Sequence, residues 1–290
     1  MSGPGVAALA ACVLALAPLV SAAPHMVIVA GLGGEPVYAS AFVEQAQATA
    51  NAVEHVAAGV TLLVGEDAGR DRMRDALAAY RESPREDPVV VVLIGHGSYD
   101  GEHYRFNVPG PDPTADELAD WLAPLPSEHQ LVVLATSASG AAIDVLKDEG
   151  RAVIAATKDG HEANAVVFGR FWAAALTEPR ADIDKDGRID ADEAFRFVEQ
   201  AVARHYEDAQ RIATEHPRSE GDIVRFELAA IAGEGLDATP GSAATRRDEL
   251  LTEIDALRKA KGRHAEEEYF ATLQELLLEL SAVESELDER

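Results

Sequence analysis

The sequence predicts an α/β fold built on a mostly parallel sheet, with helices over both faces. Aliphatic runs alternate with helical patterns along the first two thirds of the chain, and this alternation is typical of parallel sheets. Two of these runs end abruptly in glycine or small hydroxylated residues, at Gly95–Ser98 and at Thr136–Gly140. Such endings mark the carboxyl edge of a parallel sheet, where functional groups converge. Hydrophobic residues form 47% of the 290 residues, which is enough for a large core.

The spacing of apolar residues predicts each element of this region. Short unbroken aliphatic runs predict buried strands. The strands are expected at residues 26–30, 60–64, 89–94, 131–134 and 151–156. Apolar residues at helical spacing predict the helices between and after them. The helices are expected at residues 39–57, 70–80, 114–122, 141–146, 166–176 and 193–205. Thr114 and Glu117 form a capping box, residues 103–108 alternate like a short edge strand, and 223–231 is a further apolar segment.

The charge balance excludes one class of partner. The chain has 25 Lys and Arg against 51 Asp and Glu, a formal net charge of −26. Phosphate backbones and anionic membranes would be repelled by this charge. We therefore expect an acidic, solvated surface and no nucleic-acid partner. The turn Gly31–Gly34 lacks the third glycine of a dinucleotide-binding loop, so no nucleotide cofactor is expected.

The first residues read as a targeting segment. An apolar run over residues 6–20 ends in Ser21-Ala22-Ala23, which predicts a signal peptide over residues 1–22 and a secreted or periplasmic protein. The run is too short to span a membrane comfortably. Cys12 allows an alternative, a bacterial lipoprotein. It is the only cysteine, so the mature chain would have neither a disulfide nor a thiol nucleophile.

The most specific motif is a twelve-residue loop of the EF-hand type at residues 182–193. The pattern places acidic side chains at alternate positions and a glycine, Gly187, at the sharp turn. The expected ligands are Asp182, Asp184, Asp186, the carbonyl of Arg188, Asp190 and Glu193. Six to eight oxygens around one point suit Ca²⁺. Because no second loop is evident, we expect a single calcium site without the cooperative sensing of paired EF-hands.

The C-terminal part of the chain reads as a separate helical unit. Residues 236–244 lie in a stretch rich in Gly, Thr and Pro and are expected to be a linker. Residues 245–290 carry two apolar stripes separated by Lys261-Gly262, a pattern that predicts a helical hairpin or short coiled coil. Such a hairpin would dock on the α/β domain or join copies of the chain as a homo-oligomer.

Three short motifs cover the ends of the first, third and fourth expected strands. They are Val27–Gly31, Gly95–Gly97 and Ala135–Gly140, and Ala155–Thr157 follows the next strand. In this order and context, residues 26–175 resemble the legumain/caspase-like cysteine peptidases. The resemblance implies a caspase-like three-layer α/β sandwich, which we expect to span residues 24–235.

The resemblance also implies a catalytic site. By position, His96 would be the histidine of the catalytic dyad, and the backbone N–H groups of Gly97 and Ser137 would form the oxyanion hole. Ser137 stands where the family has its nucleophilic cysteine. A thiolate forms readily beside a histidine, whereas a serine hydroxyl needs a well-aligned general base. Asp100, Asp159 and Glu162 are nearby acids that read as ordinary loop charges.

Two functions therefore stay open from the sequence. The first is a secreted, calcium-binding scaffold that lacks cysteine-peptidase activity and binds a peptide or protein partner at the old catalytic edge. The second is a hydrolase that uses Ser137 as nucleophile with His96 as its base.

Overall fold

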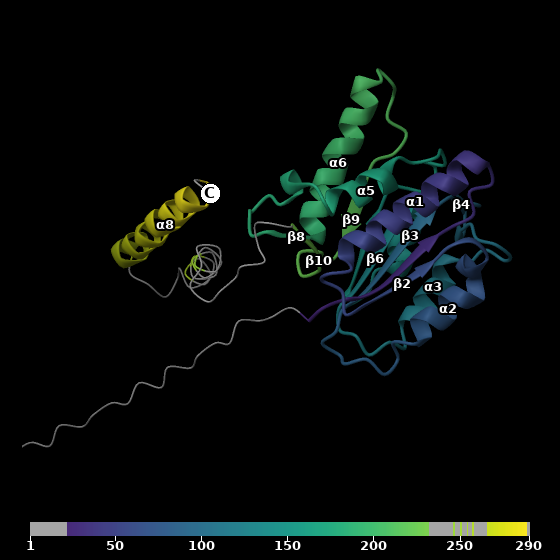
Figure 1. Cartoon of the computed structure of the whole chain (residues 1–290), viewed down its shortest axis with the longest axis horizontal. Helices are drawn as coiled ribbons and strands as arrows, with labels where there is room; N and C mark the ends of the chain where they lie inside the picture. The colour runs from purple at the N-terminus through teal and green to yellow at the C-terminus, as the bar shows by residue number, and fades with distance from the viewer. Residues whose placement is uncertain are drawn as a thin grey trace, which may run out of the picture.

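A six-stranded sheet forms the centre of the molecule in the computed structural model (Figure 1). The structure describes residues 22–231, the helical positions 246, 250, 254 and 257, and residues 266–288. The strands follow the order β2-β1-β3-β6-β7-β9. Their bounds are β1 (His25–Ala30), β2 (Gly59–Leu63), β3 (Val89–Gly95), β6 (Gln130–Thr136), β7 (Arg151–Ala155) and β9 (Arg218–Glu220). All neighbours pair in parallel except β9, which pairs antiparallel with β7.

Helices cover both faces of this sheet, as the alternation of strand side chains requires. On β1, Met26 and Ile28 belong to one buried core, and Val27 and Val29 belong to the other. The first core also contains residues of α1 (Pro36–Val53), α5 (Phe168–Ala175) and α6 (Ala191–Asp208). The second contains residues of α2 (Arg70–Ala78), α3 (Ala115–Leu122) and α4 (Ile143–Leu146). Figure 1 shows α1, α5 and α6 on one side of the sheet and α2 and α3 on the other.

The expected strands and most expected helices are confirmed, with shifts of a few residues at their ends. Thr114 and Glu117 form the expected capping box at the start of α3. The helix expected at residues 141–146 is shorter, because the 3₁₀ helix η2 (Ser139–Ala142) precedes the four-residue α4. Two further 3₁₀ turns, η1 (Gly65–Ala68) and η3 (Pro179–Ala181), connect other elements.

Two small antiparallel sheets lie outside the central one. The segment expected to be an edge strand is β5 (Tyr104–Phe106), and it pairs with β4 (Gly97–Tyr99), not with the central sheet. The strand predicted from the alternation of apolar residues is therefore confirmed. Its partner is β4, the strand just before it, and the two form a hairpin. The second small sheet joins β8 (Arg188–Asp190) to β10 (Glu227–Ala230), which lies within the apolar segment 223–231.

The C-terminal helix α8 (Glu266–Asp288) contributes to a third, small apolar cluster. In this cluster Leu280 packs with Leu250 and Ile254. It shares no residue with the two cores of the central sheet. The hairpin over residues 245–290 stays a prediction, because most of its first arm lies outside the described residues, as do the expected signal peptide up to residue 21 and the linker at 236–244.

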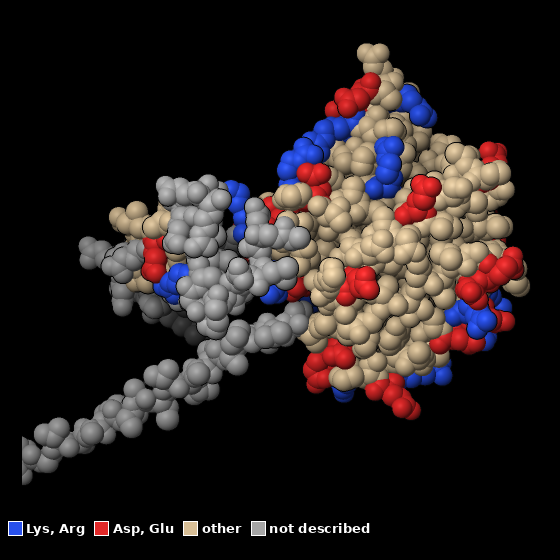
Figure 2. Space-filling model, in the orientation of Figure 1, with Lys and Arg blue, Asp and Glu red and all other residues tan. Residues whose placement is uncertain are grey.

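The surface of the described region carries charges of both signs. Figure 2 shows acidic side chains at several places on one face, with basic side chains beside many of them. Ion pairs such as Arg196–Asp192, at 2.7 Å, are part of this pattern. Among the described helices, none is long and apolar enough to cross a membrane.

Candidate functional site

The carboxyl edge of the sheet brings the two predicted catalytic residues together in register. Strands β3 and β6 are neighbours, and Gly95 pairs with Thr136 at their last rung. The next residues along the two strands are His96 and Ser137. Adjacent strands lie about 4.8 Å apart. The two backbones therefore leave the sheet side by side, as the sequence predicts.

His96 lies among aromatic side chains of helix α1. Its ring meets the ring of Tyr38 edge-on at 4.9 Å and that of Phe42 at 5.0 Å. The N–H of Asn107 donates to the carbonyl oxygen of His96 at 3.0 Å. Burial lowers the pKa of His96, although a hydrogen bond with the backbone of Gly33 opposes this effect. The imidazole is therefore neutral near pH 7, the form that a general base requires.

Ser137 is buried at the end of β6. Only 2% of the residue is exposed. Ala138, the next residue, has a left-handed backbone conformation (φ 55°), and its N–H donates to the carbonyl oxygen of Glu162 at 2.9 Å. Within residues 22–231, no hydrogen bond joins the Ser137 hydroxyl to the His96 imidazole. In this arrangement the serine lacks the aligned base that activation of a hydroxyl needs.

The other hydroxyl groups at this edge hold the loops together. The phenol oxygen of Tyr104 and Oγ1 of Thr136 lie 2.6 Å apart, and Oγ of Ser139 and Oγ1 of Thr157 lie 3.2 Å apart. Thr157 Oγ1 also accepts from the N–H of Gly140 at 2.9 Å. These bonds tie the end of β6 to β5 and to the segment after β7. The hydroxyls of Thr136 and Ser139 therefore have a structural role at this edge.

Glu162 is more than the ordinary loop charge that the sequence suggested. It is 9% exposed, and its carboxylate accepts from the backbone N–H of Lys158 (3.0 Å) and of His216 (3.1 Å). The His216 ring also contacts this carboxylate. Burial opposes ionisation, but these hydrogen bonds outweigh it, so the pKa of Glu162 lies below its usual range. His216 was not predicted, because nothing in the sequence near it signals a partner 54 residues earlier.

The predicted calcium loop has the geometry of a cation site. Carboxylate oxygens of Asp182, Asp184 and Glu193 all lie within 4.8 Å of one another. Gly187 takes φ 79° at the turn, as predicted, and its N–H donates to Oδ2 of Asp182 at 2.8 Å. The apolar side chain of Ile189 is fully buried. The loop thus closes on itself and is anchored in the core of the domain.

The end of the loop is fixed to helix α6 by its own carboxylates. Asp190 caps the helix, and Glu193 completes a capping box with it. Oε1 of Glu193 also accepts from the N–H of Ile183 at 2.7 Å, which brings the last loop position over the first ones. Burial raises the pKa of Asp190 to about 6 and that of Glu193 to about 7. Gathering these carboxylates is therefore unfavourable unless a proton or a cation is present.

These acidic side chains could hold a metal ion, and oxygen is the ligand that Ca²⁺ takes. Asp182, Asp184 and Glu193 each bring one carboxylate oxygen to this cluster. A cavity of about 210 Å³ lies next to these groups. Its lining residues are Asp184, Asp186, Arg188, Asp190, Glu193, Val224, Arg225 and Glu227. Glu227 was not predicted as part of this site, since it comes from β10, well beyond the loop in the sequence.

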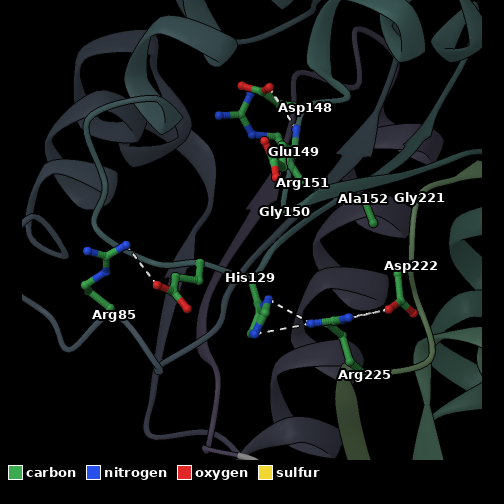
Figure 3. Close-up of a pocket in the computed structure, with 11 residues that line it drawn as sticks. Arg85, His129, Asp148, Glu149, Gly150, Arg151, Ala152, Gly221, Asp222 and Arg225 are labelled. Atoms are coloured by element: carbon green, nitrogen blue, oxygen red, sulfur yellow. Dashed lines mark hydrogen bonds and ion pairs between the residues drawn. The ribbon is translucent and has the colours of Figure 1, made fainter.

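A larger cavity, of about 670 Å³, lies at the opposite edge of the sheet (Figure 3). Residues at the starts of β6 and β7 line this cavity, whereas His96 and Ser137 follow the ends of β3 and β6. The charges on its wall are largely paired with each other: Arg85 with Glu128 at 2.8 Å and Arg225 with Asp222 at 2.5 Å. Figure 3 shows the Arg225 guanidinium directed at the ring of His129, 3.1 Å from Nδ1. This cavity contains neither predicted catalytic residue.

No protein-family model matches the chain, and comparison with curated proteins finds no similar sequence. The likeness to legumain/caspase-like peptidases therefore rests on the short motifs at the strand ends. What is observed at these motifs is a parallel sheet with the His-Gly and Ser-containing turns on neighbouring strands.

Proposed function

We propose that the protein is a calcium-binding scaffold with a legumain/caspase-like α/β domain that lacks cysteine-peptidase activity. The observation that carries the proposal is the convergence of carboxylate oxygens from Asp182, Asp184 and Glu193 within 4.8 Å. Bound Ca²⁺ would neutralise these carboxylates and link the start of the loop to helix α6. Because a hard cation prefers oxygen ligands in a flexible loop, Ca²⁺ suits this donor set.

The chemistry at the carboxyl edge supports a lack of cysteine-peptidase activity. The only cysteine is Cys12, far from Ser137 in the sequence and within the expected signal peptide. Ser137 is 2% exposed, and its hydroxyl has no hydrogen bond with His96. The half-buried His96, beside Tyr38 of helix α1, offers a surface at which a peptide or protein partner would bind.

Thermal unfolding tests the calcium site. Ca²⁺ at millimolar concentration should raise the melting temperature relative to chelator, because a ligand that binds only the folded state stabilises it. Glu193→Gln should remove most of this increase. Glu199→Gln changes an exposed carboxylate of the same helix outside the loop and should keep it. Equal melting of the wild type in calcium and in chelator would refute the proposed site.

A second candidate function is a hydrolase that uses Ser137 with His96 as base. It is favoured by one observation, the left-handed backbone of Ala138 directly after Ser137. Strained backbone of this kind in a residue other than glycine occurs often at functional sites. Opening of the edge by a substrate would then have to expose the hydroxyl and align His96.

A fluorophosphonate probe separates the two functions. The scaffold predicts no labelling of the wild type, with or without calcium. Labelling that Ser137→Ala abolishes would establish the hydrolase. A Ser137→Cys variant tests the remainder of the edge: peptidase activity in this variant would mean that only the nucleophile is missing, and its absence would mean that the pocket has changed as well.

A further inference from the structure

The short strand of the proposed calcium loop, β8, pairs with a strand that does not belong to a second EF-hand loop. Strand β8 pairs antiparallel with β10, with Ile189 opposite Ala229. Two further backbone bonds flank this pair: the N–H of Ala191 donates to Phe226 O at 2.9 Å, and that of Ile231 donates to Gly187 O at 2.8 Å. Residues 187–191 of the loop are therefore held by one segment, residues 226–231.

This segment is itself anchored in the main core. Leu228 and Ala229 are fully buried, and Phe226 is 1% exposed. All three belong to the same apolar core as β1, β3 and β6. The loop strand and the central sheet are thus connected through β10, and the position of the side chains that β10 places beside the loop is well fixed.

Two arginines line the small cavity beside the calcium ligands, Arg188 and Arg225. A guanidinium near a divalent cation opposes binding of the cation, because like charges repel. Each of these arginines has a carboxylate partner outside the loop. Nη1 of Arg188 lies 2.6 Å from Oε2 of Glu227, and Nη2 of Arg225 lies 2.5 Å from Asp222. The positive charges are therefore compensated by the segment that also supplies β10.

We propose that Glu227 is a positioning residue of the calcium site: it holds and neutralises the Arg188 guanidinium, and thereby preserves the affinity of the loop for Ca²⁺. This inference rests on the proposed calcium function. Glu227 sits opposite Asp190 in the β8–β10 pair, on the rung next to the loop ligands. Its carboxylate is only partly exposed (26%), so its charge is less screened than that of a free surface group.

A double-mutant cycle tests the inference. The dissociation constant for Ca²⁺ is measured by NMR titration, followed at the Gly187 amide, for the wild type, Glu227→Gln, Arg188→Gln and the double variant. Removing Glu227 leaves Arg188 uncompensated, so affinity should fall about threefold to tenfold. Arg188→Gln keeps the backbone carbonyl that serves as the loop ligand and removes only the guanidinium charge, so it should bind at least as tightly as the wild type. The double variant should return to within about twofold of the wild type.

Salt dependence separates an electrostatic role from a structural one. The ratio of dissociation constants between Glu227→Gln and the wild type should shrink at about 1 M salt, where screening acts over about 3 Å. A ratio independent of salt would mean that the variant merely loosens β10, and would overturn the inference. So would a double variant as weak as Glu227→Gln, since Glu227 would then act on the ion directly.

The outcomes also distinguish this inference from the proposed function. If the wild type binds no Ca²⁺, the calcium function itself fails. If the wild type binds Ca²⁺ and Glu193→Gln does not, but Glu227→Gln binds like the wild type, the calcium function stands and only the role of Glu227 is refuted.

Discussion

The backbone of Ser137 lies directly against Gly97. A Cβ atom added to Gly97 would come within 2.4 Å of the carbonyl oxygen of Ser137 and 2.7 Å of the Tyr104 ring. The two turns that end β3 and β6 are therefore packed through their main chains. This contact requires a glycine at position 97 for packing, independently of any catalytic role. It also limits how far the Ser137 turn can move.

Gly97→Ala should accordingly destabilise the domain. The added methyl group must displace backbone or a buried ring, and such overpacking costs about 1–3 kcal/mol. Chemical denaturation measures the loss in the free energy of unfolding. Gly59→Ala is a suitable control, because a Cβ there meets only His25 Nδ1 at 3.7 Å, an ordinary contact. Equal stability of the two variants would contradict the close packing of Gly97 on Ser137.

A second prediction concerns the end of helix α6. Gln210 has φ 52°, its N–H donates to Glu207 O at 2.9 Å, and the N–H of Arg211 donates to Tyr206 O at 2.9 Å. These are the two bonds of a Schellman motif, in which glycine is favoured at the left-handed position. Gln210→Gly should therefore raise the free energy of unfolding by about 1 kcal/mol. A decrease would show that the side chain contributes more than the backbone strain costs.

A third prediction concerns pH. Glu215 is 1% exposed, and both its carboxylate oxygens accept from the N–H of Val167, at 2.8 and 3.0 Å. Burial raises its pKa to about 7, against the opposing effect of hydrogen bonds from Val167 and Phe168. The folded state therefore holds a proton that the unfolded state has lost between about pH 4.5 and 7. The resulting stability is present below this window and is lost as the pH rises through it.

Comparison of Glu215→Gln with the wild type isolates this contribution. Glutamine cannot ionise, so the variant should gain stability relative to the wild type between pH 5 and 8, by on the order of 2 kcal/mol. Chemical denaturation of both proteins in chelator at pH 5 and pH 8 measures this change in relative stability. The contributions of titratable groups that both proteins share cancel in the difference. A constant difference between the two proteins across this range would mean that Glu215 ionises normally.

The local elements of the fold could be predicted because their signals are local. The aliphatic run at Val89–Gly95 is buried at every position and forms a central strand. The capping box at Thr114 and the turn at Gly187 depend on residues within the same few positions. The neighbouring placement of His96 and Ser137 also followed, because parallel strands share a carboxyl edge.

Contacts between distant segments could not be predicted in this way. Strand β9 (Arg218–Glu220) is polar and short, so no alternation marks it, yet it forms the antiparallel edge of the sheet. The pairing of β10 with the loop at residues 182–193 joins segments 37 residues apart, as in Glu227 opposite Asp190. The contact of His216 with Glu162 likewise joins residues that are 54 positions apart in the sequence. Tertiary packing decides each of these, and a single sequence carries no pattern for it.

Equilibrium dialysis against buffered Ca²⁺ tests the central claim most directly. The wild type should bind one ion per chain in the loop at residues 182–193, with a dissociation constant of about 10⁻⁴–10⁻³ M if it is an extracellular module. Glu193→Gln should weaken binding at least about tenfold, because it removes a charged ligand that supplies two oxygens. Glu199→Gln should bind like the wild type. No binding by the wild type at millimolar Ca²⁺, or equal binding by Glu193→Gln, would contradict the account.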